Sequence, residues 1–153
     1  MNHYQTILAT PLGELLIQAS AQGLTYVGFD VEKKHVNAEG ENDITTRAKQ
    51  ELSEYFAGER THFSVPLDVK GTAFQQQVWS SLCKVNFGAT ASYADIARDI
   101  NNPKAVRAVG AANGRNPISI IVPCHRVIGS NGTLTGYAGG VERKQWLLAF
   151  EKP

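Results

Sequence analysis

The chain has 153 residues, of which 42% are apolar and 19% are charged, and its formal net charge is +1. Such a composition can bury a hydrophobic core, which excludes an intrinsically disordered or collagen-like protein. The sequence has no apolar run of about eighteen residues, no basic region typical of a secretory signal and only two cysteines. We therefore expect a cytoplasmic protein without a membrane span or a disulfide framework.

The first half of the chain predicts a small α/β domain. Residues 4–8, 14–19 and 24–29 are rich in β-branched, aromatic and aliphatic side chains. Turn residues separate these three segments, so we expect a β-meander. After a polar loop, apolar residues from Ile44 recur at helical spacing as far as Gly58, which would end the helix.

The second half predicts a mostly helical domain, so the expected fold class is α+β. Thr72 is a suitable N-cap for an amphipathic helix that continues toward Gly88. We place the boundary near Gly71, which divides the chain into domains 1–70 and 71–153.

Two short helices within this half have the outline of a helix-turn-helix. Ser92 and Asp95 are spaced as a capping box that opens a helix over residues 93–100. A second helix begins at Pro103, a residue favoured in the first turn, and ends near Gly114. About three residues join the two helices, as in DNA-binding motifs of this kind.

The remaining elements surround the two cysteines. Cys83 lies inside the first helix of this half, where we expect a small buried side chain. An apolar run over residues 118–122 predicts a buried strand just before Cys124. A final amphipathic helix is predicted over residues 141–151.

The charge of the second half would favour a polyanionic partner such as nucleic acid, although such a charge difference often reflects only which faces are solvated. Residues 1–75 carry a net charge of −4, whereas residues 76–153 carry +5. The second helix of the helix-turn-helix is built of small residues around one long side chain, Arg107. Small residues in a helix are typical of tight packing against another helix.

Cys124 is the candidate nucleophile of the chain. It follows the predicted buried strand, where a rigid element gives way to a turn. His125 and Arg126 come next, and an imidazole base and a positive charge would raise the thiolate fraction of the thiol. A histidine base needs an orienting carboxylate, and we favour Glu151 of the final helix over two aspartates of the helix-turn-helix.

These residues alone leave two other functions open. A cysteine hydrolase would use Cys124, His125 and Glu151 on an ester or amide, but it has no need of a helix-turn-helix. A regulator that only binds DNA would explain the helix-turn-helix and leave Cys124 without a role. Taken singly, a cysteine, a histidine or a helix pair is more often structural than functional.

The residues around Cys124 resemble the active-site signature of the O6-alkylguanine-DNA alkyltransferases. The resemblance extends from about Phe74 to Glu151. It is carried, in order, by Ser92-Tyr93, Asn102-Pro103-Lys104-Ala105, Arg107-Ala108-Val109-Gly110, Asn116-Pro117, Pro123-Cys124-His125-Arg126-Val127, Tyr137, Gly139-Gly140 and Trp146-Leu147-Leu148-Ala149. The N-terminal half resembles in outline the ribonuclease-H-like domain of the same family.

The resemblance implies a DNA-repair protein that acts once. It would bind duplex DNA containing O6-alkylguanine as a monomer, flip the damaged nucleotide and move the alkyl group irreversibly to Cys124. No cofactor is implied. Some members of the family hold zinc through N-terminal cysteines, but no cysteine precedes Cys83 here, so no metal is expected.

The resemblance also implies roles for individual residues. Cys124 would accept the alkyl group, His125 would act as base through a water, and Glu151 would orient His125. Tyr93 would hydrogen-bond the guanine, and Asn116 would be the hinge between the recognition helix and the active-site segment. The DNA-binding residues would be Arg107, which fills the space of the flipped base, with Ser92, Ala105, Ala108, Gly110, Ala111, Ala112, Arg115 and Arg126. The base pocket would be formed by Val127, Tyr137, Ala138 and Gly139.

Overall fold

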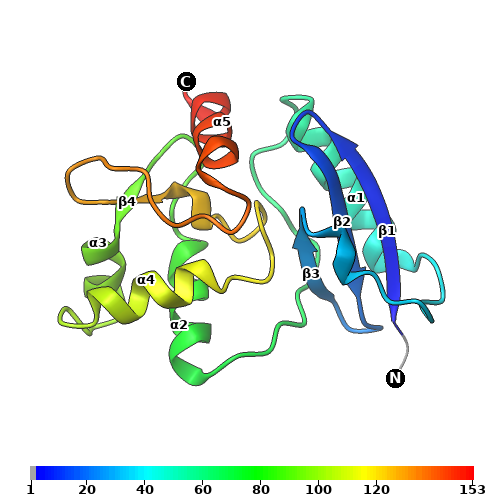
Figure 1. The fold of residues 1–153 in the computed structure, drawn as a ribbon, viewed down its shortest axis with the longest axis horizontal. Coiled ribbons are helices and arrows are strands. Elements are labelled where there is room, and N and C mark those ends of the chain that lie inside the picture. Colours follow the sequence, from blue (N-terminus) through cyan, green and yellow to red (C-terminus); the bar gives the residue numbers. More distant parts are fainter. Residues whose placement is uncertain (1–2) are drawn as a thin grey trace. The chain divides into compact units, whose positions relative to one another are not determined.

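The computed structural model describes residues 3–153, which form two compact units. One unit ends at Lys70 and the other begins at Gly71. The first contains an antiparallel sheet in which β2 lies between β1 and β3 (Figure 1). Their bounds are Tyr4–Thr10 for β1, Gly13–Ala19 for β2 and Leu24–Gly28 for β3, which confirms the predicted β-meander.

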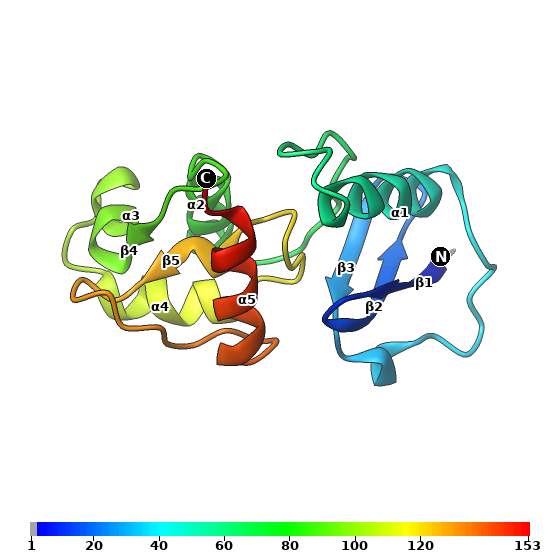
Figure 2. The same ribbon diagram turned by 90° about the horizontal axis from the view of Figure 1, so that it is seen from above.

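Helix α1 (Asp43–Phe56) covers one face of this sheet (Figure 2). Asn42 begins the helix in a capping box with Thr45, and Gly58 ends the following turn with a φ of +79°. The helix and the central strand supply most of the core, whose fully buried members include Leu15, Leu16, Ile17, Ala48, Leu52 and Tyr55. A short 3-10 helix, η1 (Val31–Lys33), lies in the loop between the sheet and α1.

Three helices pack together in the second unit (Figure 1). They are α2 (Ala73–Leu82), α3 (Tyr93–Asp99) and α4 (Val106–Gly114). The predicted N-caps of α2 and α3 are confirmed, because Thr72 and Ser92 each accept a hydrogen bond from the backbone N–H three residues on. The indole N–H of Trp79 donates to the carbonyl of Ala112 over 2.9 Å and ties α2 to α4.

Two helix boundaries differ from prediction. Helix α2 ends at Leu82, well before Gly88, and its C-cap Cys83 is exposed rather than buried. Helix α4 begins at Val106 rather than at Pro103, and its N-cap Ala105 provides no side-chain cap. The connection between α3 and α4 is therefore longer than the sequence pattern indicated.

The predicted strand over residues 118–122 is wrong. The segment is buried, but it forms turns in which Val122 N–H donates to the Ile118 carbonyl over 3.1 Å. Ile120 has a φ of +72°, a left-handed conformation that is rare and strained for a β-branched residue. The apolar pattern thus predicted the burial of this segment correctly, but it did not predict that the backbone turns.

The chain after this turn completes the second unit. The 3-10 helix η2 (Cys124–Arg126) leads into β5 (Val127–Ile128), which pairs in parallel with β4 (Ala91–Ser92). The final helix α5 (Val141–Glu151) has the predicted bounds. Within residues 3–153, no helix is both long and apolar enough to cross a membrane.

Candidate active site

Cys124 lies at the start of η2, with only 3% of its surface exposed. Its backbone N–H donates to the Val122 carbonyl over 2.8 Å, so the preceding turn fixes its position. Burial raises the pKa of the Cys124 thiol, and hydrogen bonding to Asn116 and the charge of Lys144 oppose this rise. Burial of the thiol thus acts against the increased thiolate fraction expected from the sequence, whereas Asn116 and Lys144 act in its favour.

His125 and Arg126 share the carboxylate of Glu151. The imidazole Nε2 lies 2.7 Å from Oε2 of Glu151. The Arg126 guanidinium binds both carboxylate oxygens, with Nε 2.7 Å from Oε1 and Nη2 3.1 Å from Oε2. All three side chains are buried, so this cluster joins η2 rigidly to the end of α5.

Arg126 is not available to a DNA phosphate. It is 6% exposed, and its remaining Nη1 donates to the carbonyl of Val85 over 2.7 Å. The prediction of a DNA contact is wrong because the guanidinium compensates the charge of a buried carboxylate instead.

His125 is held in its neutral form. Burial lowers its pKa, and the charges of Arg126 and Lys144 act in the same direction, while Glu151 opposes them. Its second ring nitrogen, Nδ1, is buried and has no hydrogen-bond partner among the described residues. A neutral imidazole with Nε2 bound to a carboxylate and Nδ1 unoccupied is suited to accept a proton.

Lys144 is a residue that the sequence analysis missed. Its side chain is fully buried, and Nζ donates to the carbonyls of Val127 over 2.5 Å and Thr135 over 2.7 Å. The available signal was helical spacing, since residue 144 lies three residues before Leu147 and seven before Glu151. All three therefore share the buried face of α5.

The loop between β5 and α5 is anchored near Cys124. The Tyr93 hydroxyl lies 3.3 Å from the carbonyl and 3.2 Å from Oγ1 of Thr135, so the phenol expected to bind guanine is bonded to this loop. Tyr137 is buried, which raises its pKa, and its ring centroid is 6.5 Å from that of His125. Of the other expected pocket residues, Val127 is buried, Gly139 is half-buried and Ala138 is exposed.

Asn116 holds the strained turn before Cys124. Its Nδ2 donates to the carbonyls of Ile118 and Val122 over 3.2 and 2.8 Å, and its Oδ1 accepts from the Ile118 N–H over 3.0 Å. These bonds connect the end of α4 to the segment that carries the thiol. This position suits the hinge role that the resemblance implies.

We expect Asn116→Ala to lower the free energy of unfolding by about 1–3 kcal/mol, because it leaves the buried Ile118 N–H without a partner and removes one of the two hydrogen bonds that the Ile118 and Val122 carbonyls each accept. Urea unfolding of the variant and the original protein measures the difference. Asn131→Ala is the matched control, since the Asn131 side chain is exposed and bonds only within its own turn at Thr133. Equal stability of the two variants would show that Asn116 does not support the turn.

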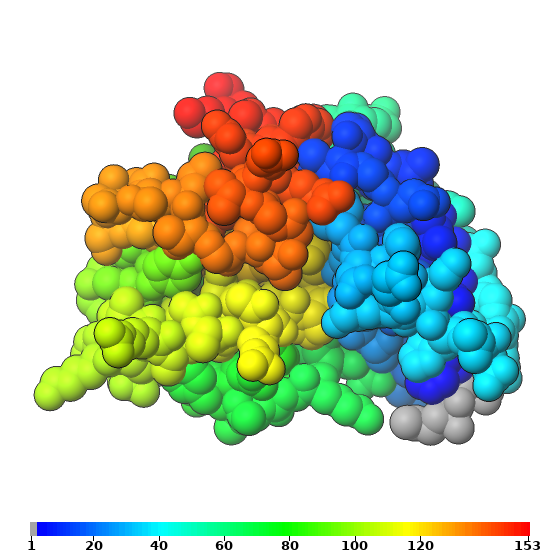
Figure 3. Space-filling model, viewed as in Figure 1, coloured from blue at the N-terminus to red at the C-terminus, as the bar shows by residue number. Residues whose placement is uncertain are grey.

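Helix α4 presents a face of small side chains between two arginines. After Arg107, the exposed residues of α4 and its C-cap are Ala108, Ala111, Gly114 and Arg115. They lie one, four, seven and eight positions beyond Arg107, so they share one face of the helix. This part of the chain, yellow in Figure 3, reaches the surface of the molecule. Ala112 is buried against α2, so its expected DNA contact is wrong.

The other expected DNA-binding positions flank this face. Ala105 is half-buried at the start of α4, and Ser92 is half-buried as the N-cap of α3. A Cβ added to Gly110 would lie 3.9 Å from the Tyr93 ring, so α4 and the phenol are close neighbours. The small face therefore lies beside a residue of the candidate active site.

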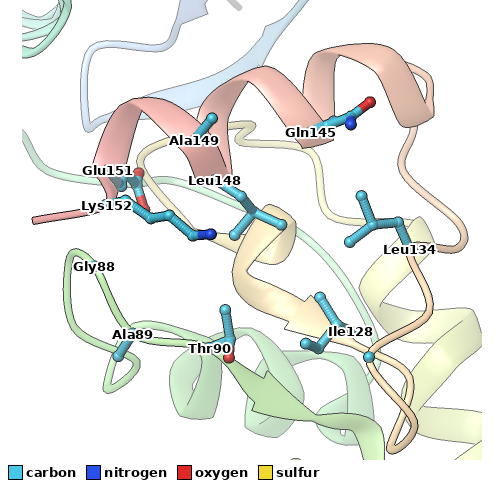
Figure 4. A pocket seen from close by; sticks show the side chains of 11 residues that line it. Gly88, Ala89, Thr90, Ile128, Leu134, Gln145, Leu148, Ala149, Glu151 and Lys152 are labelled. Carbon is cyan, nitrogen blue, oxygen red and sulfur yellow. The ribbon is translucent and has the colours of Figure 1, made fainter.

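A separate pocket of about 500 Å³ lies between α5, the loop at Gly88 and β5 (Figure 4). Most of its lining is apolar, including Ile128, Leu134 and Leu148. Its lining includes Glu151 but neither Cys124 nor any of the expected base-pocket residues, so we do not assign the reaction to it.

Both units match models of one protein family. Residues 3–69 match the ribonuclease-like domain of 6-O-methylguanine DNA methyltransferase, and residues 73–153 match the DNA-binding domain. The chain therefore belongs to this family, as the resemblance implied. Its fold class is the expected one, a small sheet-containing domain followed by a helical domain.

Particular relatives and solved structures resemble the chain over nearly its whole length. It is 50% identical to the constitutive methylated-DNA–protein-cysteine methyltransferase of Bacillus subtilis, covering 99% of this chain and 96% of the relative. It is 49% identical to the enzyme of that name from Methanosarcina acetivorans, covering 97% of each. A crystal structure of Mycobacterium tuberculosis OGT in complex with DNA has a TM-score of 0.89 and 44% identity, covering 99% of this chain and 93% of that one.

Proposed function

We propose that this protein repairs duplex DNA by moving the alkyl group of O6-alkylguanine to Cys124. The observation that carries the proposal is a buried thiol directly before a neutral histidine whose Nε2 contacts a carboxylate and whose Nδ1 has no protein partner in the described chain. Family membership and a solved DNA complex of a relative support DNA as the partner.

The geometry suggests how the thiol is activated. The thiol proton passes through a water to Nδ1 of His125, and Glu151 stabilises the imidazolium that forms. The thiolate then attacks the saturated carbon, forming the S–C bond as the C–O6 bond breaks. Guanine leaves with the electron pair of that bond and takes up a proton. Tyr93 can supply a hydrogen bond to the leaving base by exchanging its bond to Thr135 for one to guanine.

The reaction occurs once for each protein molecule. The product at Cys124 is a thioether. Because a thioether has no good leaving group, water does not remove the alkyl group and the thiol is not regenerated. No further group is required, since the thiol, the base and the carboxylate come from the chain itself.

Helix α4 would bind the DNA so that the damaged nucleotide can rotate out of the base stack toward Cys124. Its exposed face of small residues fits a narrow minor groove, and Arg107 occupies the space left when the nucleotide rotates out of the stack. Arg115, at the far end of the same face, is placed to contact a phosphate. Residues 71–153 thus carry DNA binding and alkyl transfer.

We further propose that the protein acts as a monomer in the cytoplasm. Its chemistry requires a free thiol, and both cysteines are free, which suits a reducing compartment. One thiol meets one lesion, so the reaction needs no residue from a second copy.

The direct test uses a duplex oligonucleotide that contains O6-methylguanine with a radiolabelled methyl group. We expect at most one equivalent of label per protein, all of it on the peptide that contains Cys124, and none with Cys124→Ala. Cys83→Ala is the matched control and should retain full transfer. Release of more than one equivalent as free methanol would instead identify a hydrolase, and label on another residue would refute the role of Cys124.

A further inference from the structure

The pocket between α5, the loop at Gly88 and β5 has no role in the proposed function. Its volume of about 500 Å³ is within the range of small-molecule sites, and its lining comes entirely from the second unit. Ile128, Leu134 and Leu148 form its apolar walls, and Figure 4 shows their side chains facing one space. The apolar part of a ligand would bind here because contact with these side chains removes it from water.

Lys152 places an unpaired positive charge at the edge of this pocket. It belongs to the lining and is exposed, and no carboxylate of residues 3–153 lies within ion-pair distance of its Nζ. Figure 4 shows the side chain extending toward Leu148, so the ammonium adjoins the apolar wall. A ligand with an apolar part and a negative charge would therefore meet both.

The other charge in the lining is already compensated. The Arg126 guanidinium binds both carboxylate oxygens of Glu151, at 2.7 and 3.1 Å, and Oε2 also contacts His125. Glu151 is 1% exposed, so its carboxylate does not present a free negative charge to the pocket. The remaining lining residues are uncharged. The net charge of the lining is therefore that of Lys152, which favours an anion over a neutral or cationic ligand.

We propose that this pocket is a second binding site, which takes a small monocarboxylate with an apolar chain. The chain lies among the three apolar side chains of the walls, and the carboxylate pairs with Lys152. One lysine matches the single negative charge of a carboxylate. The site goes beyond the proposed function, because its lining includes neither Cys124 nor the expected base pocket.

A ligand in this pocket contacts segments that hold the candidate active site. Leu134 of the lining precedes Thr135, whose carbonyl lies 3.3 Å from the Tyr93 hydroxyl. Glu151, also in the lining, contacts His125. These segments come together only in the folded second unit. A saturating concentration of the ligand should therefore raise the urea midpoint of unfolding.

The test titrates octanoate into the full-length protein labelled with carbon-13 at its methyl groups, followed by nuclear magnetic resonance. We expect saturable binding, with the largest shifts at the methyl groups of Ile128, Leu134 and Leu148. Each buried methylene contributes about fourfold to affinity, so butanoate should bind at least about tenfold more weakly than octanoate. Binding that does not saturate, or largest shifts at Ala138 of the expected base pocket, overturns the proposal.

Removal of one charge tests the role of Lys152. Lys152→Met should weaken octanoate binding by about threefold to fivefold and leave the binding of octanol unchanged, because the alcohol carries no charge. Lys84→Met is the charge-matched control, since Lys84 is exposed and pairs with Asp99 at the surface. Equal octanoate affinity in Lys152→Met and the original protein contradicts the proposal.

Filling the pocket tests its location independently of charge. Ala149 lies in the lining on the exposed side of α5, so Ala149→Trp should weaken octanoate binding by about tenfold or more. Ala57→Trp, at the exposed end of α1, is the matched control. Full octanoate affinity in Ala149→Trp refutes the assigned site. These titrations involve no DNA, so a protein that binds octanoate here but takes no label from DNA refutes the proposed function alone.

Discussion

Glu151→Gln is expected to lower the free energy of unfolding by about 3–5 kcal/mol and to abolish detectable alkyl transfer. The substitution leaves the Arg126 guanidinium buried without a counter-charge, which is the larger part of the stability loss. It also removes the carboxylate that stabilises His125 when the imidazole takes the thiol proton. Urea unfolding and transfer of radiolabel measure the two effects separately.

A control on the same helix distinguishes the loss of the Glu151 contacts to His125 and Arg126 from the general effect of removing one negative charge from α5. Glu142 lies exposed in the first turn of α5, so Glu142→Gln should cost no more than about 1 kcal/mol and leave transfer intact. The double variant Arg126→Met with Glu151→Met removes both buried charges together. It should recover part of the stability but none of the transfer. Recovery of transfer would show that Glu151 serves structure only.

Arg107→Ala is expected to reduce alkyl transfer from duplex DNA by about 100-fold, because rotating a nucleotide out of the stack costs a few kcal/mol that the arginine offsets. Reaction with free O6-benzylguanine should be nearly unchanged, since a free base needs no flipping. Single-turnover rates on the two substrates give the comparison.

Arg115→Ala is the matched comparison for this experiment. It lies at the other end of the same exposed face, and a phosphate contact there should weaken binding modestly and reduce the salt dependence of binding. Equal losses of Arg107→Ala on duplex and free base would refute the role of Arg107 in flipping.

Local features of the fold were predictable because neighbouring residues produce them. The N-cap at Thr72 and the capping box at Ser92 depend on side chains that reach backbone groups three residues away, and both are present. The β-meander follows from short apolar segments separated by turns. The final helix was predicted with its full bounds because its apolar face recurs at regular spacing.

The features that were missed depend on partners far apart in the sequence. Arg126 was taken for a DNA ligand because its partner Glu151 lies 25 residues away. An apolar run could not show that the segment before Cys124 turns, since the Asn116 side chain replaces the hydrogen bonds of a strand. Lys144 was not identified from the sequence, although its spacing from Leu147 and Glu151 placed it on the buried face.

The different exposure of the two cysteines determines which thiol is oxidised first when the protein is stored in air. Peroxide reacts with accessible thiolates, and although burial raises the pKa of both thiols, Cys83 is exposed whereas Cys124 is covered. Sulfenic acid or intermolecular cross-links should therefore accumulate first at Cys83. A preparation that has begun to oxidise during storage can look damaged on a non-reducing gel while its repair capacity is still complete.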